Sequence, residues 1–186
     1  HPVFRSSFEA MQTVAFLGLG SIGRPMAKRI AAAGFPLSVW IRSAERVSAF
    51  VKEHKLTLAK PAADAVKGAD VVAVCLSTST DVDQVLDASV VAAMKSGATL
   101  LDLTSGDPAT SKKIAERLKA KNIGFIDAPV SGGVKGAEAG TLTVMCGGDA
   151  KDVERVTPVI QAFGQKIVHC GPIGAGDAVK AMNQAL

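Results

Sequence analysis

The stretch TVAFLGLGSIGRPMAKRIAAAG, at residues 13–34, constrains the fold of this chain more than any other segment. A short apolar run leads into Gly18, Gly20 and Gly23, and an amphipathic segment with Met26 on its apolar face follows. Glycines in G-x-G-x-x-G spacing between a strand and a helix are typical of a turn that holds a pyrophosphate. The three glycines would permit, in order, the tight turn, close approach of the ligand to the backbone, and close packing of helix on strand.

The same turn supplies the first candidate binding residues. Besides its glycines it contains Leu19, Ser21 and Ile22, which lead into the predicted helix. Helix N-termini bind phosphate because their N–H groups are free and the helix dipole is positive there. The alternative is an ordinary strand-to-helix turn that binds nothing, but the strand and helix on either side favour a dinucleotide site.

The rest of the chain alternates between short apolar runs and longer amphipathic segments. The apolar runs predict strands: TVAFLGL, LSVWI, DVVAVCL, ATLLDLT, IGFIDAP, TLTVMCG and QKIVHC. The other segments predict helices: PMAKRIAAAG, SAERVSAFVKEH, DVDQVLDASVVAAM, PATSKKIAERLKAK and KDVERVTPVIQAF. TLAKPAADAVKGAD adds a short strand and a helix. We therefore expect α/β architecture, with a doubly wound, mostly parallel sheet of the Rossmann type.

Composition excludes several classes of partner. No uninterrupted apolar run approaches the length that spans a bilayer, so we expect no membrane partner. The 21 Lys and Arg residues are scattered, and aromatic residues are only 4% of the chain, so we expect no nucleic acid partner. A net charge of +4 suits a small anionic ligand.

The cysteines bear on the compartment. Cys75, Cys146 and Cys170 form no C-x-x-C pair, and each lies in or beside an apolar run. Such residues are typically buried, reduced thiols. We therefore expect a cytoplasmic protein, and we expect no metal site.

The end of the second predicted strand bears on the choice of dinucleotide. An acidic residue there would accept hydrogen bonds from the ribose hydroxyls of NAD. This chain instead has Ile41, Arg42 and Ser43, which favour NADP because a guanidinium and a hydroxyl bind a 2′-phosphate. NAD is the less favoured cofactor, and Arg42 as a plain surface charge is the alternative. We expect Leu76 and Ser77, where the run DVVAVCL ends, to line the same site.

Four segments in order resemble the β-hydroxyacid dehydrogenase family, which includes 3-hydroxyisobutyrate dehydrogenase and tartronate semialdehyde reductase. They are FLGLGSIGRPMAKRI, LLDLTSGDPATSKKIA, FIDAPVSGGVKGAEAGTLTVMCGG and GAGDAVKAMNQ. The resemblance implies a hydride transfer between NADP(H) and a small 3-hydroxy acid or its semialdehyde. It also implies that the chain corresponds to the N-terminal cofactor domain of the family.

The resemblance implies further roles for two short motifs. Ser131, Gly132 and Gly133 match the family's clamp on the substrate carboxylate, although an SGG sequence alone is also compatible with an ordinary turn. Thr104 and Ser105 match a Ser-Thr pair beside the nicotinamide. Their order is swapped here, so which hydroxyl faces the cofactor stays open.

The last segment places Lys180, Asn183 and Gln184 at i, i+3 and i+4, on one face of a predicted helix. A solvated helix face is the ordinary interpretation of such a pattern. The resemblance instead makes Lys180 the general acid and base of the reaction. Asn183 and Gln184 are both candidates to hydrogen-bond the substrate.

The expected domain organisation has three parts. Residues 1–10 precede Met11 and resemble an added expression segment, residues 11–172 form the dinucleotide-binding domain, and residues 173–186 begin an interdomain helix. The resemblance implies a further all-helical domain that closes the site, so we expect this chain alone to be inactive. The complete protein would be a homodimer or homotetramer. The alternatives are a non-catalytic dinucleotide-binding interaction module and an imine reductase-like enzyme.

Overall fold

The computed structural model describes residues 11–186, so the proposed expression segment at residues 1–10 lies outside it. The strands are β1 (Val14–Leu17), β2 (Leu37–Trp40), β3 (Thr57–Leu58), β4 (Val71–Val74), β5 (Thr99–Asp102), β6 (Gly124–Asp127), β7 (Val130–Ser131), β8 (Leu142–Gly147) and β9 (Gly164–Gly171). The helices are α1 (Gly23–Ala32), η1 (Ala44–Arg46), α2 (Ser48–Glu53), α3 (Ala62–Val66), α4 (Ser79–Val85), α5 (Ala88–Ala93), α6 (Pro108–Lys119), α7 (Gly133–Ala139), α8 (Ala150–Ile160) and α9 (Ala175–Ala185).

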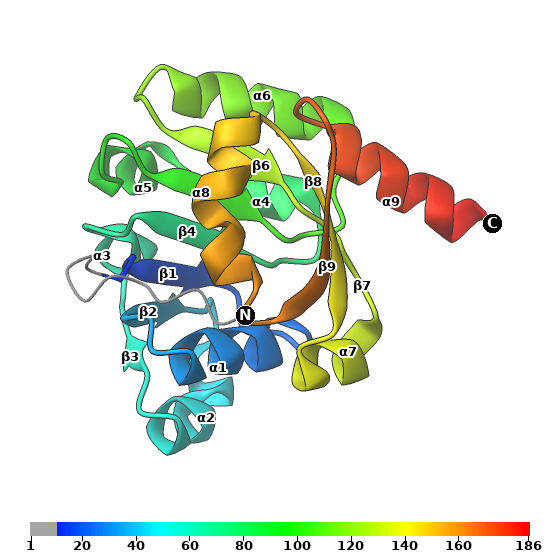
Figure 1. Ribbon diagram of the computed structural model, residues 1–186. Helices are drawn as coiled ribbons and strands as arrows, with labels where there is room; N and C mark the ends of the chain where they lie inside the picture. The colour runs from blue at the N-terminus through cyan, green and yellow to red at the C-terminus, as the bar shows by residue number, and fades with distance from the viewer. Residues whose placement is uncertain (1–10) are drawn as a thin grey trace.

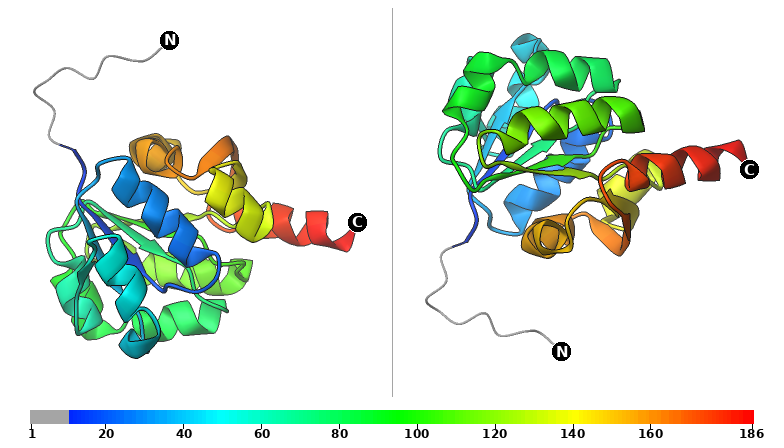
Figure 2. Two further views of the ribbon diagram at one scale, coloured as in Figure 1. Left: turned by 90° about the horizontal axis from the view of Figure 1, so that it is seen from below. Right: turned by 90° about the horizontal axis from the view of Figure 1, so that it is seen from above.

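All the strands belong to one sheet, with helices on both of its faces (Figures 1 and 2). The strand order is β3-β2-β1-β4-β5-β6-β8-β7, and β9 pairs with β8. The strands from β3 to β6 are all parallel, which confirms the predicted doubly wound α/β fold. The strand order reverses between β1 and β4, and open α/β sheets bind their ligands at such a switch point.

The sheet changes character beyond β6. A single antiparallel pair, Asp127 with Gly147, joins β6 to β8. The short β7 is also antiparallel to β8, whereas β9 runs parallel to it. The sheet is therefore mostly parallel, as predicted, with its antiparallel pairings confined to one side.

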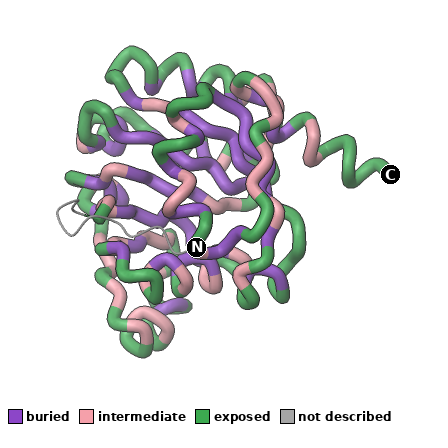
Figure 3. The backbone as a smooth tube through the Cα atoms, viewed as in Figure 1, coloured by how far each residue is buried: buried purple, intermediate pink, exposed green. Residues whose placement is uncertain are grey.

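Two apolar clusters form the core, one on each face of the sheet. Side chains alternate along a strand, so Phe16 packs with α1 and α8 on one face while Leu17 packs with α4 and α6 on the other. Both side chains are fully buried. The central strands are buried almost throughout (Figure 3), as a parallel sheet covered on both faces requires.

Two helix predictions were wrong, and one strand and one helix had not been predicted. The helix expected at residues 43–54 is divided into η1 and α2, and the helix expected at residues 81–94 is divided into α4 and α5. In the second case Asp87 ends the continuous helix, because its carboxylate accepts a hydrogen bond from the N–H of Val90 and caps α5. The β7 strand and α7 helix had no predicted counterpart.

Helix α9 leaves the body of the molecule and projects beyond the sheet (Figures 1 and 2). Gly176 and Asp177 in its first turn are buried, whereas residues 181–186 are all exposed. Met182 on its outer part has 67% of its surface accessible. Only the beginning of α9 is therefore fixed by packing.

Candidate active site

The glycine turn after β1 is shaped by close backbone contacts. Gly18 has a φ of 98°, and a Cβ there would lie 2.3 Å from the carbonyl oxygen of Cys75. A Cβ on Gly23 would lie 2.5 Å from the carbonyl oxygen of Gly18. A Cβ on Gly20, in contrast, would have no neighbour within 4 Å. The first and third glycines thus permit the packing of the turn, and the second leaves open space beside the backbone.

The start of α1 faces this space as an anion-binding helix terminus would. No side chain caps the first turn of α1, and no acidic residue lies within it. The helix dipole is therefore not offset locally by a carboxylate. The side chain of Arg24 fixes the turn from outside, since its Nε donates to the carbonyl oxygen of Leu19 at 3.0 Å.

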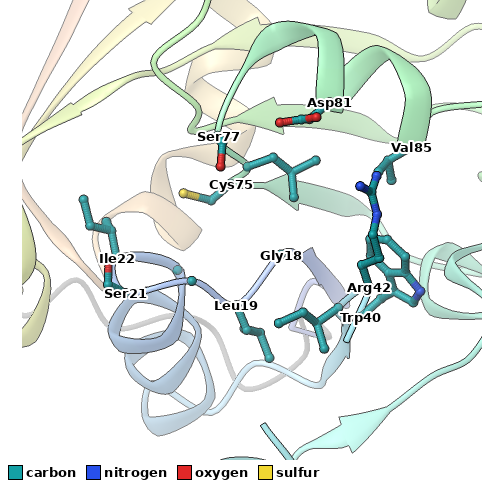
Figure 4. Close-up of a pocket in the computed structure, with 14 residues that line it drawn as sticks. Gly18, Leu19, Ser21, Ile22, Trp40, Arg42, Cys75, Ser77, Asp81 and Val85 are labelled. Atoms are coloured by element: carbon teal, nitrogen blue, oxygen red, sulfur yellow. The ribbon is translucent and has the colours of Figure 1, made fainter. Parts of the chain in front are cut away.

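A cleft of about 380 Å³ lies between the glycine turn, the end of β2 and the end of β4 (Figure 4). Its lining includes these predicted residues: Gly18, Leu19, Gly20, Ser21, Ile22, Gly23, Ile41, Arg42, Leu76 and Ser77. Trp40, Cys75, Asp81 and Val85 also line it and were not predicted. Figure 4 shows Arg42 and Trp40 on the side of the cleft opposite Ser21 and Ile22.

The end of β2 forms a second hollow next to the cleft. Arg42 and Ser43 line it together with Arg46 and Lys60, and Glu45 is its single acidic residue. The sequence indicated Arg42 and Ser43 but not the other two cations. Lys60 comes from the chain after β3, and only the fold brings it to this hollow. Three cations against one carboxylate favour an anion such as a phosphate.

The two hydroxyl residues after β5 have different surroundings. Thr104 is buried, and its hydroxyl accepts a hydrogen bond of 3.0 Å from the N–H of Leu76. Its own N–H donates to the carboxylate of Asp102. Ser105 is exposed. Thr104 therefore joins the end of β5 to the end of β4, and the Ser105 hydroxyl is the more accessible of the pair.

The SGG segment lies where β7 passes into α7. Gly132 and Gly133 have φ values of 131° and 63°, a region of backbone conformation that favours glycine. Ser131 and both glycines are exposed. Helices α7 and α9 both contact β8, so this segment and Lys180 are carried by elements that pack on a common strand.

Lys180 lies on α9, half-buried, one turn after the buried start of the helix. The side-chain amide of Asn183 donates a long hydrogen bond of 3.9 Å to the sulfur of Met145 on β8. Gln184 is exposed, and no hydrogen bond to its side chain is found within residues 11–186. Asn183 is therefore the better placed of the two candidate amides.

Three buried carboxylates near the base of α9 were missed by the sequence reasoning. Asp102 ends β5, Asp127 ends β6 and Asp177 lies in the first turn of α9, and each is at most 2% exposed. Burial raises the pKa of all three, to about 7 for Asp102 and about 6 for Asp177. Hydrogen bonds from Thr104 oppose the rise at Asp102, and one from Ser111 opposes it at Asp177.

Metal ligands and reactive thiols are two further kinds of functional group to consider in residues 11–186. Within residues 11–186 no group of three or more His, Cys, Asp or Glu side chains is placed to hold a metal ion. The thiols are free, and burial raises the pKa of both Cys75 and Cys146 to about 12. Such thiols are poor nucleophiles.

Comparison with known proteins identifies the fold family. Residues 13–171 match the family described as the NAD binding domain of 6-phosphogluconate dehydrogenase. The chain belongs to this family. As a member of the 6-phosphogluconate dehydrogenase NAD-binding family, it contains a dinucleotide-binding domain, and the cleft at the switch point lies where such a domain binds its ligand.

Several relatives are named dehydrogenases of small hydroxy acids. The chain is 39% identical to an NAD-dependent L-serine dehydrogenase of Pseudomonas aeruginosa and 37% identical to a 3-hydroxyisobutyrate dehydrogenase of the same organism. In both cases 95% of this chain is aligned, with 59% of the relative. A solved 3-hydroxyisobutyrate dehydrogenase of Mycobacterium tuberculosis has a TM-score of 0.89, 35% identity and coverage of 94% of this chain and 59% of that one. The chain thus spans about three fifths of the length of these relatives.

No helix in the described part of the chain is long and apolar enough to cross a membrane.

Proposed function

We propose that the chain is the cofactor-binding part of an oxidoreductase that transfers a hydride between NADP(H) and a small 3-hydroxy acid or its semialdehyde. The observation that carries the proposal is the cleft at the switch point, with open space at Gly20 and a cationic rim at Arg42. The names of the relatives support the substrate class.

The residues around the cleft fit an NADP molecule. The N–H groups of the turn at residues 18–23 would hold the pyrophosphate, and the space beside Gly20 would admit it. Arg42 and Ser43 would bind the 2′-phosphate, with Arg46 and Lys60 from the same hollow contributing positive charge. One relative is named NAD-dependent, but no carboxylate ends β2 in this chain. The preference for NADP rests on that difference.

The other proposed roles concern the cofactor's reactive end and the substrate. Leu76, Ser77 and Ser105 would border the nicotinamide, while Thr104 supports the backbone of Leu76. Ser131, Gly132 and Gly133 would bind the substrate carboxylate through a hydroxyl and backbone N–H groups. The side-chain amide of Asn183 or that of Gln184 would hydrogen-bond the substrate.

Lys180 would carry the proton in this reaction. The cofactor, when bound, supplies the hydride chemistry. During oxidation, Nζ of Lys180 would take the proton from the substrate hydroxyl, and during reduction it would donate that proton to the carbonyl oxygen. The carboxylate clamp would keep the reacting carbon at one place, since acid and base catalysis need a fixed geometry.

We further propose that residues 11–172 form the dinucleotide-binding domain and that residues 173–186 begin the connection to a second, helical part, a proposal supported by the greater length of the relatives. The complete enzyme would be a homo-oligomer whose second part closes the site. A dinucleotide-binding module without catalysis is the second candidate, but the presence of Lys180 on α9 favours the enzyme.

Two measurements test the proposal. Calorimetric titration of this chain with NADPH and NADH measures the cofactor site alone, and we expect NADPH to bind. Turnover of 3-hydroxyisobutyrate, L-serine, tartronate semialdehyde and succinic semialdehyde is then measured for this chain and for a chimera. In the chimera, the part of the P. aeruginosa 3-hydroxyisobutyrate dehydrogenase beyond its aligned span follows Leu186. Binding without turnover of any substrate in a folded chimera would favour the non-catalytic module.

A further inference from the structure

The first turn of α9 is tied to the sheet by the carboxylate of Asp127. One oxygen of this carboxylate accepts a hydrogen bond of 2.7 Å from the N–H of Gly174, and the other accepts one of 2.9 Å from the N–H of Asp177. Asp127 is fully buried at the end of β6. A buried carboxylate at a helix N-terminus makes charge-assisted hydrogen bonds and interacts favourably with the helix dipole.

Glycines allow this helix to start directly on the sheet. A Cβ on Gly176 would lie 2.2 Å from the carbonyl oxygen of Met145 and 2.7 Å from that of Asp127. A Cβ on Gly147 would lie 2.5 Å from the Asp127 carboxylate. The helix start therefore contacts both β6 and β8 at backbone distance, and no side chain separates them.

A second carboxylate ties the same turn to a different part of the molecule. Asp177 accepts a hydrogen bond of 2.7 Å from the hydroxyl of Ser111 on α6, and its carboxylate also lies against Gly106, where a Cβ would be 3.2 Å from one of its oxygens. Gly106 directly follows Thr104 and Ser105, the residues assigned to the nicotinamide end of the cleft. Asp177 thus links α9 to the cofactor side of the site.

We propose that Asp127 and Asp177 are positioning residues that fix the place of Lys180 relative to the cofactor cleft. Lys180 lies three residues after Asp177, on the same side of α9. Every residue from 181 onward is exposed, so the buried first turn is the main hold on the helix, with the long hydrogen bond from Asn183 to Met145 as a weaker contact further along. A short helix without tertiary packing is marginal in water, so loss of either anchor would release the lysine. The inference rests on the proposed role of Lys180.

A purely structural role for the two aspartates is the competing explanation, and the two roles differ in their consequences. Carboxylates with a purely structural role would change the stability of the whole domain without a selective effect on α9. Positioning carboxylates would change the order of α9 and the rate of proton transfer while the cleft at Gly18 to Gly23 still binds cofactor. The test therefore measures α9 and the cleft separately.

The first experiment uses this chain and four variants: Asp127→Asn, Asp127→Ala, Asp177→Ala and Gly176→Ala. Asp149→Ala is the matched control, because Asp149 is an exposed aspartate that caps a different helix, α8. Amide hydrogen exchange of residues 175–181 and NADPH titration are measured well below the melting temperature. We expect the two alanine variants of the anchors to lose about tenfold or more of the protection in α9, with cofactor affinity unchanged within about twofold.

Two variants separate the anchor from general damage. Asp127→Asn keeps an oxygen that can accept from Gly174, so we expect intermediate protection. Gly176→Ala leaves both carboxylates in place but pushes the helix away from Met145, so it should reproduce the loss in α9. Protection of β1 and β5 reports whether each variant is folded. Unchanged protection of α9 in folded Asp127→Ala and Asp177→Ala proteins would overturn the proposal.

The second experiment measures kinetics in the chimera described above. Misplacing a catalytic group by about 1 Å can cost on the order of 10²-fold in rate, so we expect kcat to fall by about 10- to 100-fold in Asp127→Ala and Asp177→Ala. The KM for NADPH should stay within about twofold of the parent value. An equal loss in kcat and in cofactor affinity would instead indicate a structural role. If no protein binds NADPH, the proposed function fails, while hydrogen exchange still decides whether the aspartates hold α9.

Discussion

Asp102 and Asp127 are register partners at the carboxyl ends of β5 and β6, and the carboxyl groups of both residues are buried. Burial is the main cause of the raised pKa of each, and at Asp102 the nearby Asp177 and Asp127 carboxylates raise it further. The folded protein therefore holds protons on these groups at pH values where the unfolded chain has lost them.

The first prediction concerns the pH dependence of stability. The pKa of Asp102 is raised from 3.8 to about 7, and that of Asp177 from 3.8 to about 6. Between the ordinary pKa and the raised pKa, the folded state binds more protons than the unfolded chain does. The free energy of unfolding should therefore fall as pH rises from about 4 to about 7. Each group contributes up to about 1.4 kcal/mol per pH unit. Urea unfolding at pH 5, 6 and 8 measures the slope.

The matching variant is Asp102→Asn, which removes the ionisable group and keeps an acceptor for the N–H of Thr104. We expect it to flatten the slope between pH 5 and 7 and to raise stability at pH 8. The exposed Asp64→Asn variant is the control and should follow the parent protein. A parallel slope for Asp102→Asn and the parent would contradict the assigned pKa shift.

The second prediction concerns cofactor selectivity. We expect NADPH to bind at least about tenfold more tightly than NADH, which corresponds to about 1.4 kcal/mol, a conservative value for one charge-assisted pair. Arg42→Ala should bring the two affinities close together, because it removes the guanidinium at the end of β2. Lys166→Ala, which removes an exposed cation on β9, should leave the ratio unchanged. Calorimetric titration measures both affinities. An affinity ratio that is the same in Arg42→Ala and in the parent would contradict the proposed role of Arg42 in binding the 2′-phosphate.

The third prediction separates two glycines of one turn. Gly20→Ala should leave the melting temperature nearly unchanged, since its Cβ meets no atom within 4 Å, but it should weaken NADPH binding by about tenfold or more. Gly18→Ala should destabilise the fold by more than about 1 kcal/mol, because it combines a positive φ with a contact of 2.3 Å to Cys75. Thermal unfolding and titration are measured on both variants. A Gly20→Ala protein with parental affinity would place the phosphates elsewhere.

The fourth prediction concerns the lysine. In the chimera, Lys180→Ala should leave NADPH affinity nearly intact and lower turnover by roughly 10²-fold or more, the usual scale for a lost general acid or base. Lys151→Ala on α8, an exposed lysine outside the site, is the control. Turnover of Lys180→Ala within a few-fold of the parent would mean that another group moves the proton.

Much of the fold follows from residue patterns alone. The seven apolar runs all became strands, and the central ones, β1, β4 and β5, carry enough apolar residues to be buried on both faces of the sheet. The breaks within helices were harder to predict. Asp87 lies between two apolar segments, and its capping role depends on a bond to Val90 that helix periodicity does not encode. Helix α7 contains two glycines and two alanines in seven residues and has no apolar stripe, so no pattern marked it.

The site was predictable where its residues are adjacent in sequence. The turn at residues 18–23 and the pair Arg42 and Ser43 are local motifs, and the fold brings them to adjoining hollows. Lys60 joins them only through tertiary structure. The buried aspartates did leave a signal, since LLDLT and FIDAP each place an acidic residue directly within apolar sequence. A carboxylate there must be buried and hydrogen-bonded, which is the arrangement found.

The anchoring of α9 also bears on the order in which the chain acquires its structure. Asp177 is hydrogen-bonded to two residues that are distant in sequence. Asp127 lies 50 positions before it, and Ser111 lies 66 positions before it. Both contacts need their partners in place first, because Asp127 lies at the end of β6 and Ser111 on α6, and closing the intervening loops costs entropy. We therefore expect α9 to dock as the last step of folding, after β8 and β9 have joined the parallel strands. In pulsed hydrogen exchange during refolding, its amides should become protected after those of β1 and β5.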